Sequence, residues 1–447
     1  MNNLFLVCIS FFFISSGQSK NPKNDLIKFN NKWSSPFRVS SQYCHQLVNT
    51  EGEFLFILNK TEWLYFACDH PEKVIENVKK HGANVIRVCL EGKPYYEDLG
   101  YDNWPWKGTR KNPDYDNFNE KYWNEVEKRI ILAGQNGIGI DLVLYLSLKP
   151  EVVELPKQKK YWDYAIKRLS RYSNILTWEI ANEEISNEAF QDKAGMYFKE
   201  NDPFHHPVCS SDGTTENALW PHKIWMDLAI VHTCTGQATG KDNYDLEYWY
   251  LNIAKNTRQY GKPAFNNESG REKWHKNDDP IGRRKQAWLT CNSGCFWTWH
   301  SWDGCNGIND TTYFANGWQY LSPMRKYYES IPFWTLEPNY TVCTLRRSNL
   351  VYATMSSPDR KISLMYCCTR KTSEKVENLK AFIQIKNGVY LVSFKNPATL
   401  EVISTMEFES KDIRAEREIK IPGFQDDLII EIKEITSRKK TLIVGTL

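Results

Sequence analysis

Two glutamates, each at the end of an apolar or aromatic run, are the residues best suited to chemistry in this sequence. Glu183 closes the segment TWEIANE, and Glu268 closes the segment KPAFNNE. A buried strand that stops at an ionisable side chain and leads into a polar loop is typical of the rim of an enzyme barrel. If strands repeat every ~30 residues, these two carboxylates face one another across a (β/α)8 barrel. Paired carboxylates at that rim are the groups needed to break a glycosidic bond.

The chemistry of an acetal defines what the two glutamates must do. A proton must reach the leaving oxygen, and negative charge must stabilise the oxocarbenium-like carbon. When two carboxyl groups lie about 5–5.5 Å apart, one attacks directly and the anomeric configuration is retained. One group must begin protonated and the other ionised, so their surroundings must differ. We therefore expect Glu183 and Glu268 to be catalytic, with no metal and no organic cofactor.

Five further residues fall near the expected ends of strands and are candidates for substrate binding. Arg87 is expected to hold a neighbouring glutamate ionised. Asn182 is placed to bond the 2-hydroxyl of the sugar, and His232 to order the nucleophile or contact the sugar. Trp299 offers an apolar floor for a sugar ring, and Tyr145 is a further cleft residue. Each has an ordinary alternative as a salt-bridged arginine, a core histidine or an aromatic ring packed inside the barrel.

The elements that must position these residues alternate between strand and helix over the first 300 residues. Strands are expected at 54–63, 83–90, 138–146, 175–181, 207–211, 228–233, 263–267 and 295–300. Helices are expected at 71–81, 119–136, 159–172, 245–260 and 281–291, and a long rim loop at 91–118. Parallel neighbours need crossover connections, so the pattern predicts an α/β fold, a (β/α)8 TIM barrel. A doubly wound open sheet is the alternative.

A change of pattern after about residue 335 indicates a second domain. Short strands separated by turns are expected at 349–354, 361–366, 381–385, 390–394, 400–404 and 428–432. This is typical of a small antiparallel β-sandwich. We expect a signal peptide at 1–19, a catalytic barrel at 20–335, an accessory sandwich at 336–435 and a tail at 436–447. The sandwich either supports the flank of the barrel, which we favour, or binds glycan.

The N-terminus and the composition predict an exported protein. An apolar stretch from Leu4 to Ile14, followed by small residues, is too short to span a membrane and is typical of a secretory signal peptide. The chain of 447 residues has a net charge of only +3, which gives no indication of nucleic-acid binding. Its 17 Trp and 24 Tyr favour a carbohydrate partner. We expect a monomer, secreted or periplasmic, with no membrane span.

The twelve cysteines leave two interpretations open. Loss of Cys8 with the signal peptide leaves an odd number, so at least one thiol has no partner within the chain. Cys291, Cys295 and Cys305 lie close together in sequence but lack a well-spaced fourth zinc ligand. Disulfides and buried thiols both remain compatible with the pattern.

At its two glutamates the chain resembles the clan A retaining glycoside hydrolases, which include the family 5 cellulases and mannanases. The resemblance rests on Asn182-Glu183 at the end of strand four and on Glu268 at the end of strand seven. It implies that Glu183 is the acid/base and Glu268 the nucleophile. Arg87 and two other candidates, His232 and Trp299, match clan positions in strands two, six and eight.

A second resemblance is to the apiosidase-like barrels that carry a C-terminal β-sandwich. It rests on the segment GEFLFILNKTEW, which ends at Trp63, and on the order of the two domains. Asn59-Lys60 stands where that group usually has Gly-Asp.

These observations favour a secreted retaining glycosidase that acts on a poly- or oligosaccharide. The alternative from another class is a carbohydrate-binding or adhesive barrel that has lost its catalytic activity. A hydrolase of esters or amides is disfavoured, because the sequence has no Gly-x-Ser-x-Gly turn.

Overall fold

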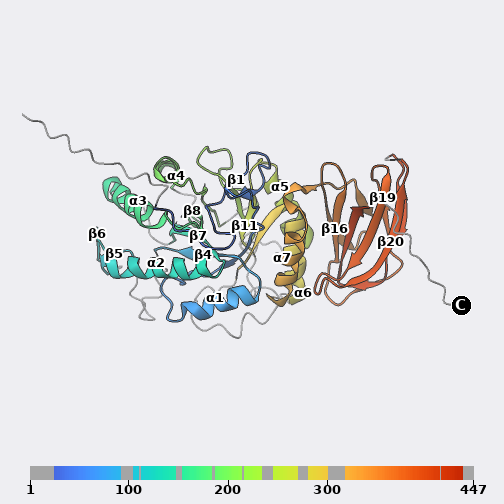
Figure 1. Cartoon of the computed structure of the whole chain (residues 1–447), viewed down its shortest axis with the longest axis horizontal. Helices are drawn as coiled ribbons and strands as arrows, with labels where there is room; N and C mark the ends of the chain where they lie inside the picture. The colour runs from blue at the N-terminus through green and yellow to red at the C-terminus, as the bar shows by residue number, and fades with distance from the viewer. Residues whose placement is uncertain are drawn as a thin grey trace, which may run out of the picture.

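A parallel barrel and an antiparallel sandwich lie side by side along the length of the molecule (Figure 1). The computed structural model describes residues 25–91, 104–109, 112–146, 154–183, 187–213, 216–233, 245–269, 280–300, 318–412 and 414–435. The expected signal peptide and C-terminal tail lie outside these residues.

Eight parallel strands form the barrel, which confirms the expected fold class. In chain order they are β3 (Leu58–Thr61), β4 (Val85–Cys89), β7 (Gly139–Tyr145), β8 (Ile175–Ala181), β9 (Val208–Cys209), β10 (Ala229–His232), β11 (Ala264–Glu268) and β12 (Cys295–Trp299). The last strand pairs with the first, Trp297 in register with Leu58. Between β9 and β10 there is no strand ladder, but Asp227 N donates to Val208 O at 2.8 Å and Val208 N donates to Asp227 Oδ2 at 2.8 Å. A doubly wound open sheet would lack the link between its first and last strands.

Helices cover the outside of this barrel. They are α1 (Pro71–Lys80), α2 (Glu120–Gln135), α3 (Leu155–Leu169), α4 (Glu188–Asn201), the π-helical segment η5 (Leu246–Asn252), α5 (Ile253–Arg258), α6 (Pro280–Asn292) and α7 (Leu321–Glu329). Local sequence signals set both ends of α2. Asn119 Oδ1 accepts from Tyr122 N at the start of α2, and Gly137 adopts a φ of 75° just after its end. The expected helix at 245–260 is divided into η5 and α5, and α4 and α7 were not predicted.

Two antiparallel sheets form the C-terminal part. The larger contains β13 (Glu337–Pro338), β15 (Leu350–Ser356), β16 (Ile362–Thr369), β23 (Asp427–Glu434), β19 (Gly388–Lys395) and β20 (Val402–Ser410) in spatial order. The smaller contains β14 (Cys343–Leu345), β18 (Lys380–Ile383) and β21 (Arg417–Lys420). Three two-stranded sheets complete the described strands: β1 (Arg38–Val39) with β2 (Leu47–Val48), β5 (Trp106–Gly108) with β6 (Pro113–Phe118), and β17 (Lys375–Val376) with β22 (Phe424–Gln425).

Strand β16 of the larger sheet is buried on both faces, which explains the adjacent cysteines. Cys367 joins the core between the two sheets, whereas Cys368 joins the core shared with the barrel. Successive residues of a strand point to opposite faces, so the two side chains pack into different cores. The nine cysteines among the described residues are all free thiols, and eight of them are buried. For Cys291 and Cys295 this supports the interpretation as buried thiols.

Helix α6 joins the two parts of the molecule and, with α7, stands between barrel and sandwich in Figure 1. Its Arg284 donates to Asp427 through Nε at 2.8 Å and through Nη2 at 2.6 Å. Its Trp288 stacks on Tyr366, with ring centroids 5.5 Å apart. Because α6 leads directly into β12, these contacts favour a supporting role for the sandwich.

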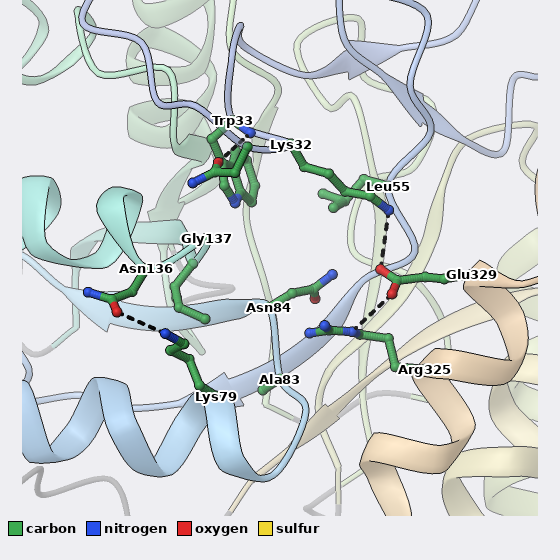
Figure 2. A pocket seen from close by; sticks show the side chains of 12 residues that line it. Lys32, Trp33, Leu55, Lys79, Ala83, Asn84, Asn136, Gly137, Arg325 and Glu329 are labelled. Carbon is green, nitrogen blue, oxygen red and sulfur yellow. Dashed lines mark hydrogen bonds and ion pairs between the residues drawn. The ribbon is translucent and has the colours of Figure 1, made fainter.

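A pocket of about 330 Å³ lies at the opposite end of the barrel from the carboxyl ends of the strands (Figure 2). Glu329 accepts ion pairs there from Lys32 at 3.2 Å and Arg325 at 3.4 Å. Lys79 donates to Asn136 Oδ1 at 3.0 Å on the other side of the pocket. The amino-terminal face of such a barrel usually contributes to stability. The pair of Lys32 and Glu329 joins the N-terminal segment to α7, and the bond from Lys79 to Asn136 joins α1 to the end of α2.

None of the helices in the described ranges is long and apolar enough to cross a membrane.

Candidate active site

Glu183, Glu268 and His232 converge at the carboxyl ends of the barrel strands. Glu183 follows β8, and the other two are the last residues of β11 and β10. One oxygen of each glutamate and one ring nitrogen of the histidine lie within 4.8 Å of one another. His232 Nδ1 is 3.8 Å from Glu183 Oε1 and 3.9 Å from Glu268 Oε2. Neighbouring parallel strands end at the same rim, so residues distant in sequence meet here.

The two carboxylates have different surroundings. Glu268 is 2% exposed, accepts a hydrogen bond from Arg87 Nη1 at 3.0 Å, and places Oε1 3.1 Å from His300 Nε2. The side chain of Glu183 is 35% exposed, and its backbone adopts a φ of 57°. A positive φ is uncommon for a residue with a side chain and is often found at functional sites. One carboxylate is therefore buried beside a cation, while the other faces solvent.

Arg87 organises the base of this site. Its Nε donates to Glu179 Oε2 at 2.8 Å and its Nη2 donates to Glu179 Oε1 at 2.5 Å. Nη2 also donates to Asn182 Oδ1 at 2.7 Å and to Ser211 Oγ at 3.1 Å. Burial opposes the charged form, but the charge and hydrogen bonds of Glu179 outweigh burial and raise the pKa of Arg87. The guanidinium is thus a permanent positive charge inside the barrel.

A second carboxylate layer lies below the first. Burial and, after it, the charge of Glu179 raise the pKa of Asp141 to about 7, although the charge of Arg87 opposes the rise. Asn59 Nδ2 donates to Asp141 Oδ2 at 3.3 Å, and Thr177 Oγ1 donates to Asp141 Oδ1. Inside the barrel, the positive charge of Arg87 is therefore shared among the carboxyl groups of Glu179, Glu268 and Asp141.

Two groups of side chains bring possible metal ligands together: Glu183, His232 and Glu268, and separately Asp141, Glu179 and Cys209. In each group the guanidinium of Arg87 bonds a carboxylate. The charge of this fixed cation therefore already offsets part of the negative charge that a metal ion would neutralise. The arrangement is better suited to acid–base and nucleophilic chemistry.

Three of the five expected binding residues, Arg87, Asn182 and His232, lie beside the glutamates. Tyr145 is fully buried instead: its hydroxyl donates to Gln158 Oε1 at 2.5 Å and accepts from Trp162 Nε1 at 2.8 Å, both on α3. It supports the packing of α3 on the strand end, and we no longer assign it to the cleft.

Trp299 departs from the expectation for a reason of strand geometry. It is in register with Lys60, whereas Thr61, the next residue of β3, is in register with the inward-pointing Arg87. Trp299 therefore lies on the outer face of the barrel, and the guanidinium of Arg283 on α6 lies over its ring at 5.6 Å. The next residue, His300, points inward, with its Nδ1 3.0 Å from Thr61 Oγ1. We propose no sugar contact for Trp299.

Sequence reasoning missed Glu179, Ser211 and His300. Glu179 could have been found, because a charged residue inside an otherwise apolar buried strand is rare unless paired. His300 directly follows β12, as Glu183 follows β8, so the same signal applied to it. Nothing in the sequence indicated a role for Ser211. It is the fold that brings its hydroxyl close enough to donate to Glu179 Oε1 at 2.6 Å.

Comparisons with known proteins show the fold and the family of this chain. Residues 41–341 match the family model described as apiosidase-like, catalytic domain. One solved structure, a glycoside hydrolase, superposes with a TM-score of 0.71 at 15% identity, over 92% of this chain and 99% of the other. A glycoside hydrolase family 5 structure from Bacteroides vulgatus ATCC 8482 superposes with a TM-score of 0.69 at 16% identity, over 90% of this chain and 95% of the other. No curated protein matches the sequence.

Proposed function

Because this chain belongs to the apiosidase-like family, whose catalytic domain matches residues 41–341, we propose that it is a secreted retaining glycosidase that cleaves an oligo- or polysaccharide. An apiosidase is by definition a glycoside hydrolase, so the family supplies the reaction class. The retaining outcome and the roles of individual residues rest on the geometry of the site.

The separation of the two glutamates carries the proposal. One oxygen of Glu183 and one of Glu268 lie within 4.8 Å of each other. Retaining enzymes hold their carboxyl groups about 5–5.5 Å apart, whereas inverting enzymes need about 6.5–9.5 Å to admit a water molecule. The observed spacing therefore supports direct attack by one carboxylate on the sugar.

We assign the roles of the two glutamates from their surroundings. Glu268, bonded to Arg87, is the nucleophile: one of its oxygens forms an ester bond to the anomeric carbon as the glycosidic C–O bond breaks. Glu183 gives its proton to the departing oxygen and then removes a proton from the water that hydrolyses the ester. Solvent access to Glu183 suits this exchange of protons.

The neighbouring side chains hold the pair in place. Arg87 Nη1 donates to Glu268 Oε2, and His300 Nε2 lies 3.1 Å from Glu268 Oε1, so both oxygens of the carboxylate have a close neighbour that restricts its orientation. Arg87 also donates to the amide oxygen of Asn182, which fixes the orientation of the amide and leaves its nitrogen to donate to the 2-hydroxyl of the sugar. His232 lies between the two glutamates and contacts the bound sugar or the nucleophile.

Substitution of each glutamate tests the assignment. Glu183→Gln and Glu268→Gln are each expected to lower turnover by at least about 1,000-fold, because the removal of a principal catalytic group is costly. Glu188→Gln is the matched control, since Glu188 begins α4 near Glu183 and its side chain is 56% exposed. Circular dichroism checks the fold of all three. Full activity in either site variant would contradict the proposal.

A panel of activated aryl glycosides separates the proposal from its alternative, a barrel that only binds carbohydrate. The enzyme releases phenol from at least one member, and a pure binding protein releases none. Export is tested separately by N-terminal sequencing of the mature protein, which is expected to begin after about residue 19.

A further inference from the structure

We propose that Gly213 is a positioning residue: the absence of a side chain there allows the carboxyl group of Glu183 to stand beside Glu268. Its effect on catalysis rests on the proposed function. The steric part stands on the structure by itself.

Space, and not backbone conformation, requires glycine at this position. A Cβ built on Gly213 would lie 2.9 Å from each of Cγ, Cδ and Oε1 of Glu183. Non-bonded carbon atoms prefer about 3.5–4.0 Å, so this contact cannot persist. Gly213 is not among the glycines with a positive φ, and its backbone therefore accepts an L-residue without strain. These three atoms of Glu183 are also the nearest atoms that a Cβ would meet.

Two other features complete a slot around Glu183. On another side, His232 Nδ1 lies 3.8 Å from Glu183 Oε1. The positive φ of Glu183 fixes the direction in which its side chain leaves the backbone. Gly213 follows β9 and His232 ends β10, so two neighbouring strands bound the slot. Among the residues that the structure describes, the ion-pair contact of the Glu183 carboxyl group is the long one to His232 at 3.8 Å, so the group is held mainly by shape.

Added bulk at 213 therefore moves the carboxyl group without unfolding the barrel. The Glu183 side chain is 35% exposed, so it can swing toward solvent when a methyl group enters the slot. Displacement of a reacting group by about 1 Å can cost about 100-fold in rate. Gly213→Ala should thus impair the acid/base while the nucleophile Glu268 stays in place.

The expected kinetic defect has a specific signature. A 2,4-dinitrophenyl leaving group departs without a proton, so formation of the ester on Glu268 does not need Glu183. A phenyl leaving group needs the proton. Gly213→Ala is expected to lower kcat/KM about 100-fold for the phenyl glycoside and less than about threefold for the 2,4-dinitrophenyl glycoside of the sugar that the wild-type enzyme releases.

A double-mutant comparison shows whether Gly213 acts through Glu183. In Glu183→Ala the three clashing atoms are absent, so adding Gly213→Ala to it should change kcat/KM less than twofold. An equal loss in both backgrounds would mean that Gly213 has a structural role only, and would overturn the proposal.

A crystal structure of Gly213→Ala gives a readout that needs no substrate. Glu183 Oε1 is expected to lie well beyond its present 3.8 Å from His232 Nδ1, with Arg87 and Glu268 unmoved. An unmoved Glu183 would overturn the inference even if the protein proves to be a glycosidase. Conversely, a displaced Glu183 in a protein inactive on every glycoside would contradict the proposed function and leave the steric relation intact.

Discussion

Arg87 and Glu179 form a two-point fork inside the barrel, with Nε to Oε2 at 2.8 Å and Nη2 to Oε1 at 2.5 Å. Both side chains are fully buried. The fork leaves Nη1 of the arginine to meet Glu268 at 3.0 Å. A bidentate pair fixes orientation as well as distance, so Glu179 sets the direction from which the guanidinium reaches the proposed nucleophile.

Glu179→Gln is expected to lower both stability and activity. Removal of the charge leaves a buried guanidinium underpaired, which costs about 3–5 kcal/mol in the free energy of unfolding. The arginine then tilts, and kcat/KM falls at least about tenfold. Urea denaturation and steady-state kinetics measure the two effects.

The matched control for this variant is Glu127→Gln. Arg168 makes the same two-point contact with Glu127, from Nε to Oε1 at 3.1 Å and from Nη2 to Oε2 at 2.8 Å, but both side chains are partly exposed. Its loss is expected to cost less than about 1 kcal/mol and to leave activity unchanged. Equal effects of the two substitutions would show that burial does not give Glu179 its role.

His300 and Trp299 provide a second test, because these adjacent residues lie on opposite sides of the barrel wall at the end of β12. His300→Ala removes a partner of Glu268 Oε1 and is expected to lower kcat about 10- to 100-fold with little change in KM. Trp299→Phe leaves kcat unchanged and lowers the free energy of unfolding by about 1–3 kcal/mol, since its ring packs against α6. A raised KM in Trp299→Phe alone would restore the sugar-platform interpretation.

Asp141 predicts a pH-dependent difference in stability. Burial, followed by the charge of Glu179, raises its pKa from 3.8 to about 7 in the folded protein, while Arg87 opposes the rise. Between about pH 4 and pH 7 the unfolded chain has lost this proton and the folded chain still holds it. The contribution of Asp141 to stability is therefore present at low pH and is lost as the pH rises through this window.

Asp141→Asn removes this proton linkage. Its stability relative to the wild-type protein should rise between pH 4 and pH 7, by at most about 1.4 kcal/mol per pH unit, and level off above. Urea denaturation of both proteins at unit pH intervals measures the difference. The titratable groups that face Asp141 are Arg87, Glu179 and the Cys209 thiol. Burial raises the pKa of this thiol, so the thiol stays neutral. A difference that does not change with pH would refute the assignment.

The fold class could be predicted from the sequence, because strands such as β7 and β8 are buried on both faces and read as largely apolar runs. Ile175–Ala181 matches the expected strand four residue for residue. Of the two resemblances seen in the sequence, the apiosidase-like one is the family that the chain belongs to. The split of 245–260 into η5 and α5, and the unpredicted α4, reflect weak local patterns that tertiary packing overrides.

The site was only partly predictable, for a geometric reason. A residue at a strand end lies at the rim whatever its side-chain direction, and that rule located Glu183, Glu268 and His232. Which of two successive residues points inward depends on register with the neighbouring strand. This register places His300 inside the barrel and Trp299 on its outer face, and it cannot be read from the sequence of one strand alone.

Covalent trapping tests the central claim most directly. A 2-deoxy-2-fluoro glycoside with a 2,4-dinitrophenyl leaving group, made from the sugar that the enzyme releases, should form a long-lived ester on the protein. Mass spectrometry of the digested protein is predicted to place the label on Glu268, and the same label should form in Glu183→Gln. A label on another residue, or turnover by Glu268→Gln at the wild-type rate, would contradict the account.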